Sequence, residues 1–307
     1  MDNSQRQTAV VKETVWGTTP TAPGWKVCRE TRADGVPLSN DVRSPERTPH
    51  RMAAAMVHGN VQYQITGEFV WARDAALDIW LESLLCNSWA TNQLKNASTI
   101  NPFSLEIKHA GGGTNPYRRF QGILLNTASI SWRIGGAGTI SFNGFAKDHS
   151  TGTTAIASST YASPTPGYDP VAPSAITVNS LFGLTSPVVT AFDMTITNNI
   201  DQEYGFGSDK PQQMPLGQFD VSGSVSFYLK QLADYATFVT RQTGQVLDFT
   251  IGSVANNKDQ LQLPNVDVWN PSVPDKASRG SDEVTLMYLG KYYATDTDAL
   301  KLIRNVA

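Results

Sequence analysis

The chain has 307 residues and a formal net charge of -3, and only 17% of its residues are charged. This composition argues against a nucleic-acid-binding protein, because binding phosphate requires a surplus of lysine and arginine. The sequence has no run of about 20 apolar residues for a membrane span and no signal-peptide pattern, so we expect it to be made and kept in the cytoplasm. Cys28 and Cys86 are too few for a disulfide framework or a metal site, and we expect both to be reduced and structural.

The first elements along the chain are an N-terminal arm, residues 1–26, and a polar connection rich in proline and arginine, residues 34–51. A strand is predicted over 62–71, because apolar and polar side chains alternate there around a central glycine. Residues 74–85 follow with the apolar spacing of a short helix. Long connections in compact domains are commonly functional, which makes 34–51 a candidate for contact with a partner.

The same series of elements then occurs a second time. The segment 218–227 matches 62–71 position by position, with glycine again at its centre, and a second short helix is predicted at 232–239. The strands that follow each helix also correspond in order: 104–107 with 248–251, 120–125 with 261–266, and 139–142 with 284–287. A repeated order of strand, helix and three strands indicates two copies of one domain.

Composition sets the boundaries between the copies. Residues 150–187 are rich in serine, threonine and proline and contain a single charged residue, which is typical of an extended linker. We therefore predict a mainly β protein with two tandem β-sandwich domains, each with a flanking α-helix. The first domain spans 27–149, the second spans 188–299, and residues 300–307 form a C-terminal arm. The connection at 198–215 is the counterpart of 34–51 in the second copy.

Several predicted strands carry short polar side chains on one face and large apolar ones on the other. An antiparallel sheet with one buried and one solvated face gives this alternation. The polar positions hold hydroxyl, amide and carboxylate groups, with one arginine, Arg133, and no lysine. An ordinary solvent-exposed face is the alternative interpretation. The positions that we single out are Gln62, Gln64, Thr66, Glu68, Asp193, Thr195, Asp220, Ser222 and Ser224.

The sequence gives little support to catalysis or cofactor binding. The four histidines are scattered without metal-ligand spacing. Gly111–Thr114 lacks the Lys-Ser/Thr of a phosphate loop and favours a hairpin turn. Nothing brings two of the glutamates at 68, 82 and 106 together as a hydrolase would require. Arg118 and Arg119 are better explained by interface salt bridges than by nucleic-acid binding. We therefore predict no enzyme activity, no catalytic residues, no cofactor and no metal.

Several short motifs are spread in order over nearly the whole chain: Glu13–Pro23, Arg29–Thr31 leading to Ser44–Arg47, Ile65–Phe69 before a helix, Gly144–Asp148 and Val188–Asn199. In this order they resemble the tail tube proteins of long-tailed bacteriophages. The specificity lies in the order, because no motif is catalytic or diagnostic alone, and His50–Val57 and Gly111–Gly113 match no pattern of the family.

The resemblance implies that β-sandwich domains form rings whose inner sheets join into one barrel, and that stacked rings conduct viral DNA. The partner is then the chain itself, with other tail proteins at the tube ends, no membrane, and DNA passing without specific binding. The polar strand positions named above are expected to face the lumen. Because each chain supplies two domains, a ring of three chains with approximate sixfold symmetry is favoured over a ring of six. The residues expected in ring-stacking loops are Arg43, Glu46, Arg47, Asp209 and Lys210.

The expected location is the virion tail, with assembly in the host cytoplasm. A β-sandwich carbohydrate-binding or adhesive module is the alternative function. The two readings differ in assembly, because a tube protein should form rings or hollow rods whereas an adhesive module should stay globular.

Overall fold

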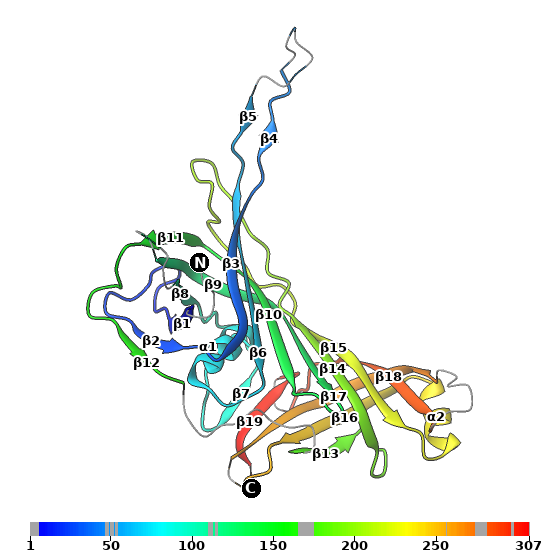
Figure 1. Cartoon of the computed structure of the whole chain (residues 1–307). Coiled ribbons are helices and arrows are strands. Elements are labelled where there is room, and N and C mark those ends of the chain that lie inside the picture. Colours follow the sequence, from blue (N-terminus) through cyan, green and yellow to red (C-terminus); the bar gives the residue numbers. More distant parts are fainter. Residues whose placement is uncertain are drawn as a thin grey trace.

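The computed structural model describes residues 6–46, 49, 52, 55–109, 113, 116–164, 175–255, 257–273, 281–295 and 298–306. These residues are mainly β, with two helices, which confirms the predicted class. Strand pairing joins all strands except β4 and β5 into one continuous network (Figure 1). Within the described residues, no helix has the length and apolar character that crossing a membrane requires.

The elements of the first half are β1 Gln7–Lys12, β2 Gly24–Val27, β3 Glu30–Ser39, β4 Val42–Arg43, β5 Met56–Val57, β6 Val61–Val70, α1 Ala75–Leu84, β7 Gln93–Lys95, β8 Phe103–Lys108, β9 Tyr117–Arg133, β10 Thr139–Ala146 and β11 Asp148–Gly152. Strand β12, Thr160–Ala162, follows. The second half contains β13 Ile176–Leu181, β14 Val188–Thr197, β15 Asp220–Tyr228, α2 Leu232–Val239, β16 Gln242–Ile251, β17 Lys258–Ser272, β18 Glu283–Gly290 and β19 Lys301–Val306.

Strand β9 belongs to two sheets and so defines the architecture. Its first residues pair with β8 and β11, in a sheet that continues through β1 and β2 to β12. Its last residues pair with β10 and β14, in a sheet that runs from β3 through β6 to β15, β18 and β17. The core lies between these layers, where Trp80 of α1 packs on Phe103 and Phe142 with ring centroids 5.1 and 5.3 Å apart. The arrangement is that of a β-sandwich.

The pairing order of the first half recurs in the second half. In the first half β3 pairs with β6, β6 with β10, β10 with β9, and β9 with both β8 and β11, while β1 pairs with β8. In the second half β14 pairs with β15, β15 with β18, β18 with β17, and β17 with both β16 and β19, while β13 pairs with β16. Helix α1 packs against β9, and α2 packs against the corresponding β17. The match therefore extends to strands that the sequence comparison did not align.

One part of the predicted alignment is wrong by a single residue. Gly67 pairs with Phe142, and the corresponding Gly223 pairs with Tyr288, so 139–142 corresponds to 285–288 and not to 284–287. A shift of one residue exchanges the two faces of a strand. The corrected register places both aromatic rings, Phe142 and Tyr288, in the core, where both are buried.

The segments predicted as the N-terminal arm, the C-terminal arm and the linker contain paired strands. Residues 7–12 form β1, residues 301–306 form β19, and the stretch 150–187 contains β12, β13 and the end of β11. Strand β19 pairs with both β17 and β7, so the C-terminal strand reaches back to the first half. The predicted domain boundaries at 26, 149, 187 and 299 stay a prediction, but the pairing order assigns β1 and β13 to equivalent places.

The central glycine of each repeat makes room for an aromatic side chain. A Cβ atom added at Gly67 would lie 2.7 Å from Cη2 of Trp80. One added at Gly223 would lie 2.6 Å from the hydroxyl of Tyr288 and 2.0 Å from the carbonyl oxygen of Asp193 on the paired strand. Neither aromatic side chain can withdraw easily, because both are buried. This explains why glycine recurs at the middle of both strands.

Replacing the second of these glycines should destabilise the fold. We expect Gly223→Ala to lower the free energy of unfolding by about 1–3 kcal/mol, because the added methyl group displaces both the Asp193 carbonyl of β14 and the Tyr288 side chain. The matched control is Gly24→Ala, where an added Cβ would meet only the Thr160 hydroxyl at 3.9 Å. Thermal unfolding of both variants checks this, and equal melting temperatures would contradict it.

Candidate functional site

The predicted polar residues on β6, β14 and β15 lie on one face of a single sheet. Glu68 pairs across the sheet with Ser141, Ser141 with Ser129, Ser129 with Thr195, and Thr195 with Ser222. Neighbouring rows bring in Thr66, Asp193, Asp220 and Ser224, while Gln62 and Gln64 continue the same face along β6. The polar face therefore crosses from the first half into the second without interruption.

Charges on the polar face are few and partly compensated. Arg133 donates to Asp193 across the β9–β14 pair, with Nη2 2.5 Å from Oδ2, and the Ser131 hydroxyl donates to the same carboxylate at 2.9 Å. The Asp220 carboxylate accepts hydrogen bonds from the side-chain amides of Asn199 at 3.0 Å and Gln218 at 3.1 Å. These groups leave a surface of short neutral and acidic side chains.

Sequence reasoning missed two features of this face. Arg32 of β3 lies opposite Glu68 and adds a second arginine, which the alternation pattern could have revealed had β3 been recognised as a strand. On β18 the outward positions hold Met287, 49% exposed, and Leu289, 37% exposed. The face is thus mostly polar from β6 to β15 and partly apolar at both ends, on β18 and at Val36 and Leu38 of β3, which lie opposite Gln64 and Gln62.

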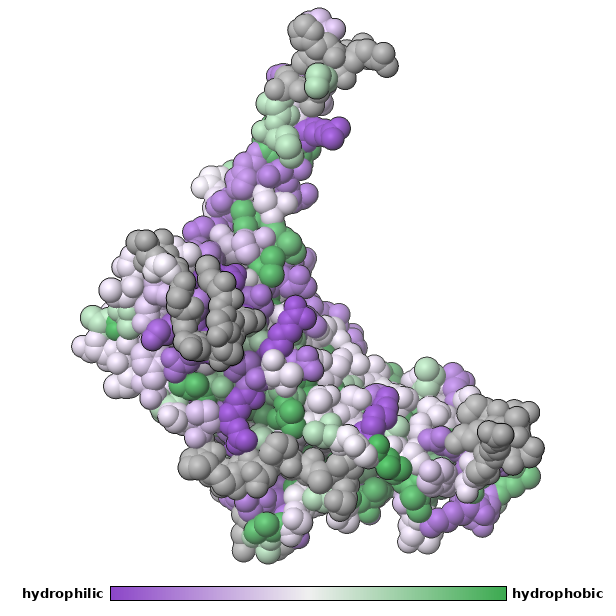
Figure 2. All heavy atoms as spheres, viewed as in Figure 1, coloured by the Kyte–Doolittle hydropathy of each residue, from purple (hydrophilic) through white to green (hydrophobic). Residues whose placement is uncertain are grey.

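A long hairpin projects from the body of the molecule. Strands β3 and β6 continue beyond the sheet into β4 and β5, which pair with each other through Val42–Val57 and Arg43–Met56 (Figure 1). We call residues 40–60 the arm. Its apolar side chains Val42, Met56 and Val57 are all exposed, Met56 by 67%, and Figure 2 shows apolar and polar residues side by side along it. The predicted stacking residues Arg43 and Glu46 lie on the arm, and Arg47 lies outside the described residues.

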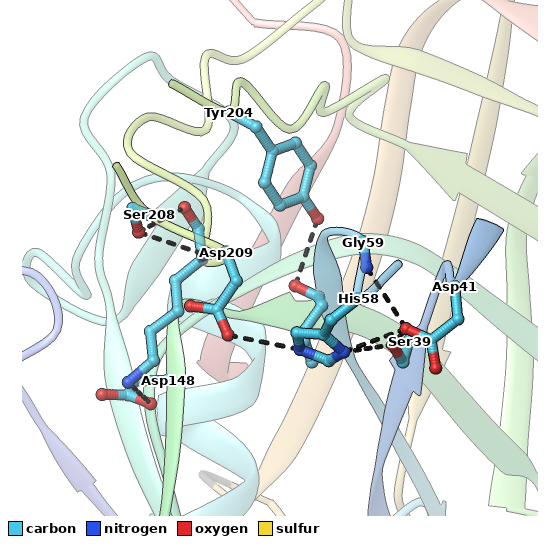
Figure 3. A network of polar contacts seen from close by, with 10 residues as sticks. Ser39, Asp41, His58, Gly59, Asp148, Tyr204, Ser208 and Asp209 are labelled. Atoms are coloured by element: carbon cyan, nitrogen blue, oxygen red, sulfur yellow. Dashed lines mark hydrogen bonds and ion pairs between the residues drawn. The ribbon is translucent and has the colours of Figure 1, made fainter. Parts of the chain in front are cut away.

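The long connection of the second half, residues 198–219, packs against the base of the arm (Figure 3). The backbone amide of Val61 donates to the carbonyl of Asp209 at 2.7 Å, and the Tyr204 hydroxyl donates to the carbonyl of Val61 at 3.3 Å. His58 lies between two carboxylates, with Nδ1 2.9 Å from Asp41 and Nε2 3.7 Å from Asp209. The connection predicted for ring stacking in the second half therefore contacts His58 and Val61, which follow the predicted segment 34–51.

The other predicted stacking residue in this connection is also bound within the chain. Lys210 Nζ lies 2.7 Å from Asp148 Oδ1, and this hydrogen bond raises the pKa of Lys210 above its ordinary value. Hydrogen bonds from the Ser39 hydroxyl and the Gly59 amide lower the pKa of Asp41, so it stays ionised beside His58. The base of the arm is thus a network of charged and polar contacts that fixes its direction.

The described residues contain no group of three or more histidine, cysteine, aspartate or glutamate side chains placed to hold a metal ion. The buried Glu106 carboxylate has structural partners: Arg119 Nε lies 2.7 Å from Glu106 Oε2, and the Tyr161 hydroxyl donates to the same carboxylate at 2.6 Å. Burial, and then this hydrogen bond, raise the pKa of Tyr161 to about 12. Cys28 and Cys86 are buried free thiols, as expected.

The family model described as phage tail tube protein matches residues 3–290. The chain belongs to the phage tail tube protein family. No curated protein matches it. Membership makes the chain a structural component of the virion tail, in a family that is generally non-enzymatic, and implies association with copies of itself in a tube and contact with other tail proteins.

Proposed function

We propose that copies of this chain assemble into stacked rings, and that these rings form the conduit through which phage DNA is ejected into the host. The observation that carries this proposal is the polar face, which continues across both halves and holds few cations. A wall that conducts DNA must not bind it. Lysine and arginine release counterions and hold phosphate, whereas short neutral and acidic groups leave the duplex free to slide.

The repeated pairing order supports two tandem tube domains in each chain. If a tube wall is built from six such domains, three chains close one ring with approximate sixfold symmetry. Joining the sheets around the ring removes their open edges and makes a continuous barrel. In this arrangement the polar positions from Gln62 to Ser224 face the lumen, and assembly takes place in the host cytoplasm.

The arm and the 198–219 connection are proposed to make the contacts between rings. The arm exposes Val42, Met56 and Val57, and apolar side chains gathered on a projection mark an interaction site. Arg43 and Glu46 of the arm, with Asp209 and Lys210 at its base, add the polar contacts of the same junction.

Electron microscopy of the purified protein tests the assembly directly. We expect rings or long hollow rods, and image reconstruction should resolve three chains in each ring. A ring containing six copies of the chain would contradict the trimer. A protein that stays globular at high concentration would contradict tube formation and favour a carbohydrate-binding or adhesive module.

A further inference from the structure

The two halves of the chain meet at an interface that we call the internal seam. Strand β9 pairs with β14 in one sheet, with Ser131 opposite Asp193. On the helix side, Arg73 Nε lies 3.1 Å from Asp259 Oδ1 of β17, and Arg304 Nη1 of β19 lies 2.7 Å from Asp78 Oδ2 of α1. The internal seam therefore joins a sheet edge and a helix of the first half to the sheet edge and outer strands of the second.

Helix α1 is covered by β1 and β2 of its own half and is reached by Arg304 across the internal seam, whereas its counterpart α2 is largely uncovered. Eight of the ten residues of α1 are buried, but only Phe238 is buried in α2. Leu232 is 72% exposed and Val239 is 62% exposed. Because removing apolar side chains from water is favourable, a partner surface that covers Leu232 and Val239 would stabilise the complex.

Two sheet edges also lack a strand partner among the described residues, one on β17 and one on β3. Strand β17 corresponds to β9, and beyond Val268 its side away from β18 has no strand partner among the described residues. Strand β3 corresponds to β14, and it pairs only with β6 in the part of the chain that the structure describes. The open edge of β17 therefore corresponds to the edge of β9 that pairs with β14. The open edge of β3 corresponds to the edge of β14 that pairs with β9.

Arginine side chains occupy the outer edge of β3. Arg6 donates to the carbonyl of Ala33, and Arg118 donates to the carbonyl of Gly35, two residues further along the same side of the strand. Asp34 holds both guanidinium groups, with Arg6 at 3.6 Å and Arg118 at 3.3 Å. Charged side chains on an edge strand protect it from uncontrolled pairing. These side chains can move away when a strand replaces them.

From this correspondence we infer that a second copy of the chain completes these surfaces by repeating the internal seam between molecules. The end of β17 of one copy pairs antiparallel with β3 of the next copy. Helix α2 docks on the β9–β11 side of that same copy, with its first-turn carboxylate Asp234 toward the region of Arg118. This inference rests on the proposed ring and specifies its contacts residue by residue.

The register of the intermolecular pair follows from the internal one. Arg32 of β3 and Asp193 of β14 hold equivalent places. Arg32 lies opposite Glu68, and Asp193 lies opposite Ser224, which corresponds to Glu68. Ser272 of β17 and Ser131 of β9 are likewise equivalent, because Ser272 lies opposite Thr285 and Ser131 lies opposite Thr139, which corresponds to Thr285. Because Ser131 and Asp193 face each other across the internal seam, Ser272 of one copy should face Arg32 of the next.

Disulfide crosslinking tests this register in assembled tubes. Arg32→Cys and Ser272→Cys, introduced together, should form intermolecular disulfides on mild oxidation, because facing residues bring their Cα atoms within the 4.4–6.8 Å that a disulfide requires. Non-reducing electrophoresis should show linked chains up to the number in one ring. The matched control pairs Ser272→Cys with Leu38→Cys, which is six residues along the same strand and about 20 Å away.

Each outcome distinguishes this inference from the proposed function. Tubes that form under reducing conditions, with no link from the Arg32 pair or with equal links from the Leu38 pair, would overturn the register while leaving the tube intact. Absence of tubes from the unmodified protein would instead count against the proposed function. A second measurement addresses α2: Leu232→Asn with Val239→Asn should leave the melting temperature of the free subunit unchanged and abolish ring formation, and normal rings would remove α2 from the interface.

Discussion

Subunits that lack the outer part of the arm should fold normally and fail to polymerise. Replacing residues 42–57 with Asn-Gly removes β4, β5 and everything between them, and Asn-Gly closes a two-residue hairpin. The pairing of Ser39 with Val61 and the contact of His58 with Asp41 are retained. Sedimentation and electron microscopy should show soluble single subunits or isolated rings and no rods.

The expected loss follows from the exposure of the arm. Because Val42, Met56 and Val57 contact no core in the free chain, removing them should change the free energy of unfolding of the subunit by less than about 0.5 kcal/mol. A second variant keeps the full length of the arm but carries Val42→Ser, Met56→Ser and Val57→Ser. It distinguishes the loss of apolar contacts from the loss of length, and we expect it to polymerise poorly as well. Rods of normal length from the shortened arm would exclude it from the junction between rings.

Reversing charge on the polar face should slow DNA ejection without preventing tail assembly. Glu68→Lys and Asp220→Lys are repeated in every subunit along a tube, so the wall gains cations at regular intervals. Each lysine that contacts phosphate releases a counterion, and the resulting affinity falls steeply as salt rises. Virions carrying both changes should therefore have tails of normal length, eject DNA slowly at low salt and recover as salt is added.

Neutral replacements provide the control for this experiment. Glu68→Gln with Asp220→Asn removes the same two carboxylates but adds no cation, and ejection should stay close to that of the unmodified virion. Single-particle measurement of ejection rates at two salt concentrations separates the cases. An ejection rate that is unaffected by the lysine substitutions at low salt would mean that this face does not line the DNA path.

Local alternation made much of the fold predictable. The repeated pattern around Gly67 and Gly223 located β6 and β15, and the helix predicted at 232–239 coincides with α2. The residues assigned to the polar face share one face of a sheet because the side-chain period of a strand is strictly two. A one-residue shift reverses that alternation, but Met287 is apolar on the outward face of β18, so the pattern of 284–288 does not fix the register.

Contacts between distant segments could not be predicted in this way. Arg73 and Asp259 are separated by 186 positions, and neither lies in a motif that would indicate the other. The arm was recognised only as a polar connection because Val42, Met56 and Val57 are scattered among charged residues and prolines. Strands such as β1 and β19 are short, and what identifies them is a partner far away in the chain.

The pairing of β19 with β7 also sets the order in which the structure can be completed during synthesis. Leu94 faces Leu302, so β7 of the first half can pair only after residues 301–306 of the second half have been synthesised. The amide of Asn198, only 3% exposed, likewise donates to the carbonyl of Leu84 at the end of α1. Because domains generally fold in the order of translation, a nascent or truncated chain has an unfinished first half. Only chains that include β19 then have a finished first half, which couples the proposed assembly to synthesis of the second half.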